Sequence, residues 1–223
     1  MKTRLLDDSA VQRYIVDGHL AICPTLPADY HPALKAQLDA LIERDGNPGN
    51  DLIERIPDLA RLFADPAVAG ALQSLLGPDY LVHPHRHCHH NTQGSGGQNM
   101  HQDSYEDDQN VRHHRTRWGM AFYYPQDTPV ELGPTGIIPG SHYHNGDPAD
   151  DLPGEVPLTG EAGTVVLVHY DLWHRAMPNS TERPRYMVKF LFTRLQEPNG
   201  PSWDTAGADW PAEDDPRMQK EAE

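Results

Sequence analysis

The sequence predicts a mainly β fold, a β-sandwich or jelly roll with helices packed outside it. Amphipathic helical patterns fill the first third of the 223 residues, and short β-prone runs separated by Gly, Pro, Asn and Asp follow from Tyr80 onward. The 21 prolines are scattered along the chain, which suits a turn-rich globular protein better than a helical bundle. Helices first and strands afterwards therefore indicate a β core with helices laid on it.

The length suits one substantial domain, because a chain of this size is short for two separate cores. We expect a single domain over residues 1–223. Its parts are a mostly helical segment 1–79, a β core 80–196 and an acidic, proline-broken C-terminal tail 197–223.

Two segments before Tyr80 have the period of amphipathic helices. In residues 65–78, Asp65 can cap a helix, Pro66 fits its first turn and Gly77 ends it. The earlier helix, within residues 27–50, has an apolar stripe of Leu34, Leu38, Leu41 and Ile42.

The later part of the chain contains β-prone runs bounded by turn residues. These runs are YLVHPHRHCHH (80–90), RWGMAFYYP (117–125), GPTGIIPGSH (133–142), GTVVLVHYDLWHRA (163–176) and RYMVKFLFTRL (185–195).

The formal net charge of −15 argues against a nucleic-acid or anionic-membrane partner, because phosphate groups are bound by an excess of Lys and Arg. No run reaches the roughly 18 to 20 apolar residues of a membrane span. The first ten residues lack the apolar core of a secretory signal, so we expect a cytoplasmic protein. Cys23 and Cys88 are far apart and predict no disulfide framework.

A His-x-Asp pair, His101 and Asp103, follows the glycine-rich run GSGG. Residues i and i+2 of a strand point to the same side, so this imidazole and carboxylate can face one ion. His169 and His174, at the end of an apolar strand, are both candidates for a third ligand. Two histidines and one carboxylate with open positions are typical of non-haem Fe(II) oxygenases.

Such an oxygenase needs a source of electrons, which is commonly 2-oxoglutarate, and a fixed cation must hold the distal carboxylate of that molecule. Arginine suits this task because its planar fork binds a carboxylate through two hydrogen bonds and keeps its charge. Arg185 opens the last β-prone run, eleven residues after His174. Arg183 has the same strand parity and is the competing candidate.

Three separated motifs carry a resemblance to a known family: HQD at 101–103, GPTGIIPGSH at 133–142 and DLWHRAMPNSTERPRYMVKFLF at 171–192. In this order they resemble the phytanoyl-CoA dioxygenase family of Fe(II)/2-oxoglutarate oxygenases. The resemblance covers roughly residues 11–196, because YIVDGHLAI at 14–22 is also similar to the opening strand of the family.

The resemblance implies a double-stranded β-helix, the cupin-like form of the jelly roll. It also implies that His101, Asp103 and His174 bind the metal, that His169 does not, and that Arg185 holds 2-oxoglutarate. Gln102 and Trp118 match positions that contact this cosubstrate in family members. The sequence departs from the family at Ala176, where a small hydroxyl residue is common, so one hydrogen bond to the cosubstrate is missing or replaced. The implied cofactors are Fe(II), 2-oxoglutarate and O2.

Asp103 also bears on the chemistry, because related halogenases have Ala or Gly at this position and bind chloride there. The carboxylate therefore favours hydroxylation or a related oxidation.

Candidates for substrate contacts lie in three places. Arg86 or a histidine of HPHRHCHH at 83–90 could line the pocket, and a second metal site is the alternative for these histidines. Lys189 shares the strand face of Arg185, so it either enters the pocket or lies solvated at a sheet edge. The third candidate is a lid that receives an anionic substrate through Arg112, Arg115 and Arg117, which otherwise pair with Glu106, Asp107 and Asp108.

The sequence thus predicts an Fe(II)/2-oxoglutarate-dependent dioxygenase that hydroxylates a small molecule and releases succinate and CO2. A cupin-like metalloenzyme that does not use 2-oxoglutarate would leave Arg185 without a purpose. A non-catalytic binding module would not need three metal ligands. The sequence gives no substrate identity and no oligomeric state.

Overall fold

The computed structural model describes residues 3–103, 116–144 and 154–195, so the predicted tail 197–223 lies outside the described residues. The α-helices are α1 (Asp8–Asp17), α2 (Tyr30–Asp45), α3 (Leu52–Arg55), α4 (Ala60–Ala64) and α5 (Pro66–Leu76). The strands are β1 (His19–Ile22), β2 (Tyr80–Asn91), β3 (Trp118–Tyr123), β4 (Thr135–Ile137), β5 (Val156–Pro157), β6 (Val165–His169), β7 (His174–Ala176) and β8 (Arg185–Arg194). Short 3₁₀ turns are η1 (Gly49–Asp51), η2 (Pro57–Leu59), η3 (Val130–Leu132) and η4 (Ser141–Tyr143). Within these ranges, none of the helices is both long enough and apolar enough to cross a membrane.

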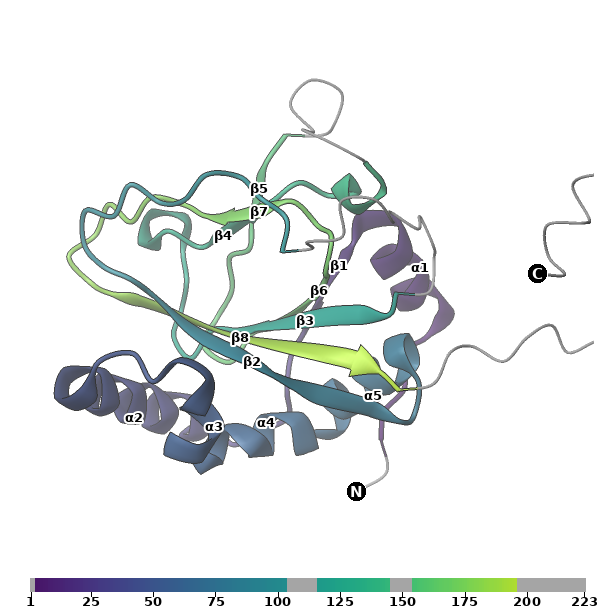
Figure 1. Ribbon diagram of the computed structural model, residues 1–223, viewed down its shortest axis with the longest axis horizontal. Helices are drawn as coiled ribbons and strands as arrows, with labels where there is room; N and C mark the ends of the chain where they lie inside the picture. The colour runs from purple at the N-terminus through teal and green to yellow at the C-terminus, as the bar shows by residue number, and fades with distance from the viewer. Residues whose placement is uncertain (1–2, 104–115, 145–153, 196–223) are drawn as a thin grey trace, which may run out of the picture.

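The strands form two antiparallel sheets. The major sheet has the strand order β1-β6-β3-β8-β2, and the minor sheet has the order β5-β4-β7. Figure 1 shows helices α2 to α5 along one side of β2, β8 and β3, with β4 and β7 on the other side. The arrangement confirms the expected sandwich of sheets with helices outside it.

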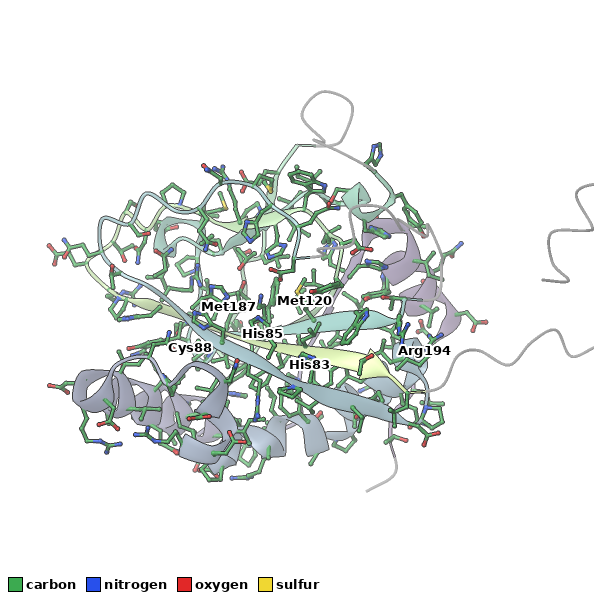
Figure 2. All side chains as sticks on the ribbon, in the orientation of Figure 1. His83, His85, Cys88, Met120, Met187 and Arg194 are labelled. Atoms are coloured by element: carbon green, nitrogen blue, oxygen red, sulfur yellow. The ribbon has the colours of Figure 1, made fainter. Side chains whose placement is uncertain are left out.

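The major sheet separates two apolar cores. One core packs the helices against side chains such as Val188 and Phe190 of β8. The other fills the interior, the space between the two sheets, and includes Met120 of β3, Ile137 of β4 and Met187 of β8 (Figure 2). Both faces of β8 are therefore buried, and alternate residues of this strand face different cores.

Helix α5 begins where the sequence predicts it. The Asp65 side chain accepts hydrogen bonds from the backbone N–H groups of Ala67 at 2.9 Å and Val68 at 3.3 Å. The same carboxylate accepts from the backbone and the hydroxyl of Thr25, at 2.8 and 2.7 Å, and so ties the chain after β1 to the helix. Gly77 ends the helix with φ 90°. The expected stripe of α2 is confirmed as well, because Leu34, Leu38 and Leu41 are buried.

The run 163–176 differs from the sequence expectation, because it forms two strands instead of one. Strand β6 ends at His169, a turn closes with the hydrogen bond from Leu172 N–H to the His169 carbonyl at 3.0 Å, and β7 begins at His174. β6 belongs to the major sheet and β7 to the minor sheet. The turn therefore places the two candidate histidines in different sheets.

We predict that Asp65→Ala lowers the free energy of unfolding by about 2 to 4 kcal/mol, because four hydrogen-bond donors lose the acceptor that this buried carboxylate provides. Urea denaturation measures this change. Asp7→Ala is the matched control, since Asp7 caps α1 through one hydrogen bond to Ala10, and it should cost about 1 kcal/mol. Equal losses for the two variants would contradict the assigned role of Asp65.

Candidate metal centre

An antiparallel backbone bridge brings His101 and His174 together. The His101 N–H donates to the His174 carbonyl at 3.0 Å, and the His174 N–H donates back to the His101 carbonyl at 2.9 Å. Residues paired in this way lie directly opposite each other with side chains on the same face. Their rings are accordingly close, with centroids 4.6 Å apart.

The backbone also fixes which nitrogen of each ring can bind a metal. Nδ1 of His101 lies 2.8 Å from the Asn99 carbonyl, and Nδ1 of His174 lies 2.8 Å from the Leu172 carbonyl. A carbonyl only accepts, so Nδ1 carries the hydrogen in both rings and Nε2 keeps its lone pair. Histidines that ligate metals are commonly oriented by such a hydrogen bond from the other ring nitrogen.

Asp103 completes the group. Its Oδ2 lies 3.6 Å from His174 Nε2. One ligand atom from each of His101, Asp103 and His174 lies within 4.8 Å of the other two. In the described ranges this is the one group of three or more His, Cys, Asp or Glu side chains with such spacing. The histidines of HPHRHCHH at 83–90 do not form a second group of this kind.

The electrostatics suit metal ligation. Burial lowers the pKa of His174 to about 4, so its imidazole is neutral at pH 7 and can donate its lone pair. Burial alone would raise the pKa of Asp103, but His174 and Lys189 outweigh this effect and hold that pKa below its ordinary value. Two imidazoles and one carboxylate are the donor set that suits an Fe(II) site with open positions.

Arg185 lies fully buried at the start of β8, where its backbone pairs with Asn91 of β2. Its Nε donates to the Gly133 carbonyl at 2.9 Å. Nη1 and Nη2 are buried and have no hydrogen-bond partner among the described residues. Burial lowers the pKa of Arg185, yet a guanidinium keeps its charge in proteins. A buried cation with two unpaired donor groups fits a carboxylate that binds through both oxygens.

The hydroxyl of Tyr124 lies near Arg185, and Thr135 lies beside Tyr124; the sequence predicts no chemistry for either residue. Tyr124 and Thr135 are buried and lie beside each other, and within the described chain neither hydroxyl has a hydrogen-bond partner in a third residue. Thr135 pairs with Ala176 across β4 and β7. Strand alternation could have identified Tyr124, since it continues the interior face of Met120 and Phe122.

Lys189 also reaches this group of residues. Its Nζ donates to Asp103 Oδ2 at 2.8 Å, and its side chain is 8% exposed. Of the two alternatives that the sequence leaves open, the structure has the one in which Lys189 enters the interior. Phe122 packs beside His174, with ring centroids 5.6 Å apart, and closes the apolar side of the centre.

Gln102 belongs to the His-x-Asp segment, and Trp118 lies at the start of β3. Gln102 donates from its side-chain amide to the Asp171 carbonyl at 2.6 Å, so it holds the His-x-Asp segment against the turn between β6 and β7. Trp118 begins β3, is half-buried, and contacts the rings of His83 and Tyr170.

Other candidates lie elsewhere. Arg86 pairs with Phe190 in the register of β2 and β8, on the face that packs against the helices, and its guanidinium binds Glu54 of α3 at 3.2 Å. The structure therefore does not bring Arg86 to the candidate centre. Arg112 and Arg115 lie outside the described residues, and Arg117 is exposed just before β3.

His169 is not part of the group. It ends β6, where the ring lies beside His142 at a centroid distance of 4.6 Å and Nδ1 lies 3.8 Å from Asp171 Oδ2. Of the two histidines in this segment, the structure brings His174 to Asp103.

Several solved structures have a similar fold. The carbocyclase SnoK from nogalamycin biosynthesis, described as non-haem and α-ketoglutarate-dependent, is similar with a TM-score of 0.70 and 20% identity, over 85% of this chain and 84% of that one. The epimerase SnoN, solved with Fe3+, α-ketoglutarate and nogalamycin RO, matches with a TM-score of 0.70 and 18% identity, over 92% and 90%. EctD from S. alaskensis, solved with 2-oxoglutarate and 5-hydroxyectoine, matches with a TM-score of 0.70 and 21% identity, over 85% of this chain and 77% of that one.

These likenesses establish the fold as a jelly roll of the double-stranded β-helix type. Among curated proteins, no sequence matches. The family model described as phytanoyl-CoA dioxygenase (PhyH) matches residues 36–187, which is most of the chain and includes His101, Asp103, His174 and Arg185. This protein therefore belongs to the phytanoyl-CoA dioxygenase family.

Proposed function

We propose that the protein is an Fe(II)/2-oxoglutarate-dependent dioxygenase that hydroxylates a small molecule. One observation carries the proposal: Arg185 is fully buried, and its Nη1 and Nη2 have no hydrogen-bond partner among the described residues. Arg185 lies on the interior face of β8, the strand from which Lys189 contacts Asp103 of the triad. A metal centre alone does not require this arginine, whereas a metal-bound dicarboxylate does.

The triad would hold the iron through Nε2 of His101, Nε2 of His174 and the carboxylate of Asp103. Both imidazoles are oriented by carbonyl groups of their own segments, so their lone pairs are available without rearrangement. Asp103 fills the position that is vacant in the related halogenases, which supports hydroxylation over halogenation.

The distal carboxylate of 2-oxoglutarate would bind Nη1 and Nη2 of Arg185. Tyr124 lies near this arginine and Thr135 lies beside Tyr124, so both hydroxyls would donate to the same carboxylate. Because Thr135 pairs with Ala176, a hydroxyl from the neighbouring strand takes the place of the one that Ala176 lacks.

When bound, iron and 2-oxoglutarate supply the oxidising chemistry with O2, and succinate and CO2 are released. The chain binds and orients these groups and excludes water with apolar side chains such as Phe122 and Met187. SnoK and SnoN are named as a carbocyclase and an epimerase, so this architecture serves more than one oxidative outcome. We assign hydroxylation because it requires from the protein only the metal triad, the 2-oxoglutarate site at Arg185 and the apolar side chains that exclude water.

Two alternatives are less well supported. A cupin-like metalloenzyme without 2-oxoglutarate would keep a buried guanidinium unpaired, which is costly. A binding module without catalysis would have no use for three convergent metal ligands.

We predict that His174→Ala abolishes the binding of one Fe(II) per chain, because the site keeps only two ligands. Metal analysis of the protein after anaerobic loading measures the occupancy. His169→Ala is the matched control and should keep full occupancy, since His169 lies in the other sheet. Iron loss in His169→Ala with normal occupancy in His174→Ala would show that the wrong histidine is assigned.

We predict that Arg185→Met weakens 2-oxoglutarate binding by on the order of 2 to 5 kcal/mol while iron occupancy stays nearly intact, because the buried charge-assisted pair is lost. Titration of the anaerobic Fe(II) protein with 2-oxoglutarate measures the affinity. Arg183→Met, a change at an exposed arginine two residues earlier, serves as the control. A larger loss at Arg183 than at Arg185 would overturn the assignment.

We predict that Thr135→Val weakens 2-oxoglutarate binding by about 0.5 to 1.5 kcal/mol, the contribution of one neutral hydrogen bond. The double variant Thr135→Val/Ala176→Ser should recover affinity, because it returns a hydroxyl from the opposite residue of the β4–β7 pair. The same titration measures both. Unchanged affinity in Thr135→Val would show that this hydroxyl does not contact the cosubstrate.

A further inference from the structure

Arg185 and Lys189 are the buried Arg and Lys side chains in the part of the chain that the structure describes. They lie four residues apart on β8 and therefore on the same face, toward the interior. Arg185 is accounted for by the cosubstrate in the proposed function. Lys189 is not, since 2-oxoglutarate has its two carboxylates at the metal and at Arg185.

Lys189 has donors to spare. Its ammonium has three N–H groups, and among the described residues it has one hydrogen-bond partner, Asp103 Oδ2 at 2.8 Å. The strand opposite offers imidazoles and no carboxylate: His87 pairs directly with Lys189 across β2 and β8, and His89 follows two residues later. Burial lowers the pKa of His87 and brings the pKa of His89 to about 3, so these rings add no charge at pH 7.

The charges of the described interior residues do not balance, once the metal and 2-oxoglutarate are counted with them, without a further anion. Among the described interior residues, Asp103 carries one negative charge, and Lys189 and Arg185 carry one positive charge each. A divalent metal adds two positive charges and 2-oxoglutarate adds two negative ones. One positive charge is left in excess, in a region shielded from water where an uncompensated charge is costly.

We propose that the substrate is a monoanion, with a carboxylate as its charged group, and that Lys189 binds this carboxylate beside the metal. Lys189 is then a specificity-determining residue. The inference rests on the proposed function, because the count of charges includes the metal and 2-oxoglutarate. The opposing possibility is that Lys189 serves Asp103 alone and leaves the substrate free to be neutral.

The test uses protein loaded with Ni(II), which binds at the same donor set without turnover, and saturating 2-oxoglutarate. Calorimetric titration compares straight-chain monocarboxylates from acetate to hexanoate with the primary amide of each. We expect at least one acid to bind the unmodified protein about tenfold or more tightly than its amide, since a charge-assisted hydrogen bond is lost in the amide.

Two neutral variants decide the role of Lys189. Lys189→Met removes the charge and the hydrogen bond to Asp103. Lys189→Gln removes the charge but keeps an N–H donor for Asp103, so it can be measured if Lys189→Met does not fold. In both we expect the preference for acid over amide to fall to within about threefold, and Lys189→Arg should keep it. Lys35→Met is the matched control, because Lys35 lies on α2 and pairs with Asp39.

The proposal is overturned if no acid is preferred by the unmodified protein, or if both neutral variants keep the preference. Failure of the proposed function has a different result: the unmodified, metal-loaded protein does not bind 2-oxoglutarate when it is titrated with that molecule, before any acid or amide is added. In that event the acid and amide series is repeated on Ni(II)-loaded Arg185→Met without 2-oxoglutarate, where Lys189 is the remaining buried cation of the described interior.

Discussion

The register of β8 is the constraint on which both the packing and the candidate site depend. The strand pairs with β2 on one side and β3 on the other, and both of its faces are buried. Its even residues pack against the helices, whereas its odd residues bring Arg185, Met187 and Lys189 into the interior. A slip of one residue would move two charges into the helix-facing core, so the burial of Tyr186, Val188, Phe190 and Phe192 fixes where those charges lie.

The minor sheet contributes in another way, because it is short and each of its pairs has a consequence for the site. Ile137 pairs with His174, which places the histidine over the apolar interior, and Thr135 pairs with Ala176. The bridge between His101 and His174 then adds the His-x-Asp segment to the far side of β7. Rigid strand pairing thus positions all three candidate ligands, and the order of the segments in the chain matters less than their alignment across the sheet.

The sequence predicts a large part of this arrangement where the determinants are local. Asp65, Pro66 and Gly77 identify α5 without tertiary information, and the two-residue spacing of His101 and Asp103 already implies a common face. The choice between His169 and His174 could not be made from the residues alone, because it depends on a turn that moves the chain from one sheet to the other. The resemblance to the family supplied that choice.

The interior surroundings were harder to predict for the same reason. Tyr124 and Thr135 look like ordinary core residues, and only the pairing of β4 with β7 and the approach of Arg185 give their hydroxyls a purpose. Arg86 was expected as a pocket candidate because of its histidine-rich neighbours. Its register partner Phe190 lies on the helix-facing side of β8, so the guanidinium turns toward Glu54, and this pairing with a distant strand is not visible in the local sequence.

The ion pair between Lys189 and Asp103 has a consequence for how such a centre can be assembled in a cell. A carboxylate at 17% exposure would be a liability in a chain that has just been synthesised, before any metal arrives. The ammonium of Lys189 neutralises the charge of Asp103 within the fold, without a metal ion. Small zinc domains, by contrast, fold only when their ion is present. In the proposed function, chain folding can therefore come first and metal binding afterwards, and a shortage of the metal would leave a folded apoprotein instead of an unfolded chain.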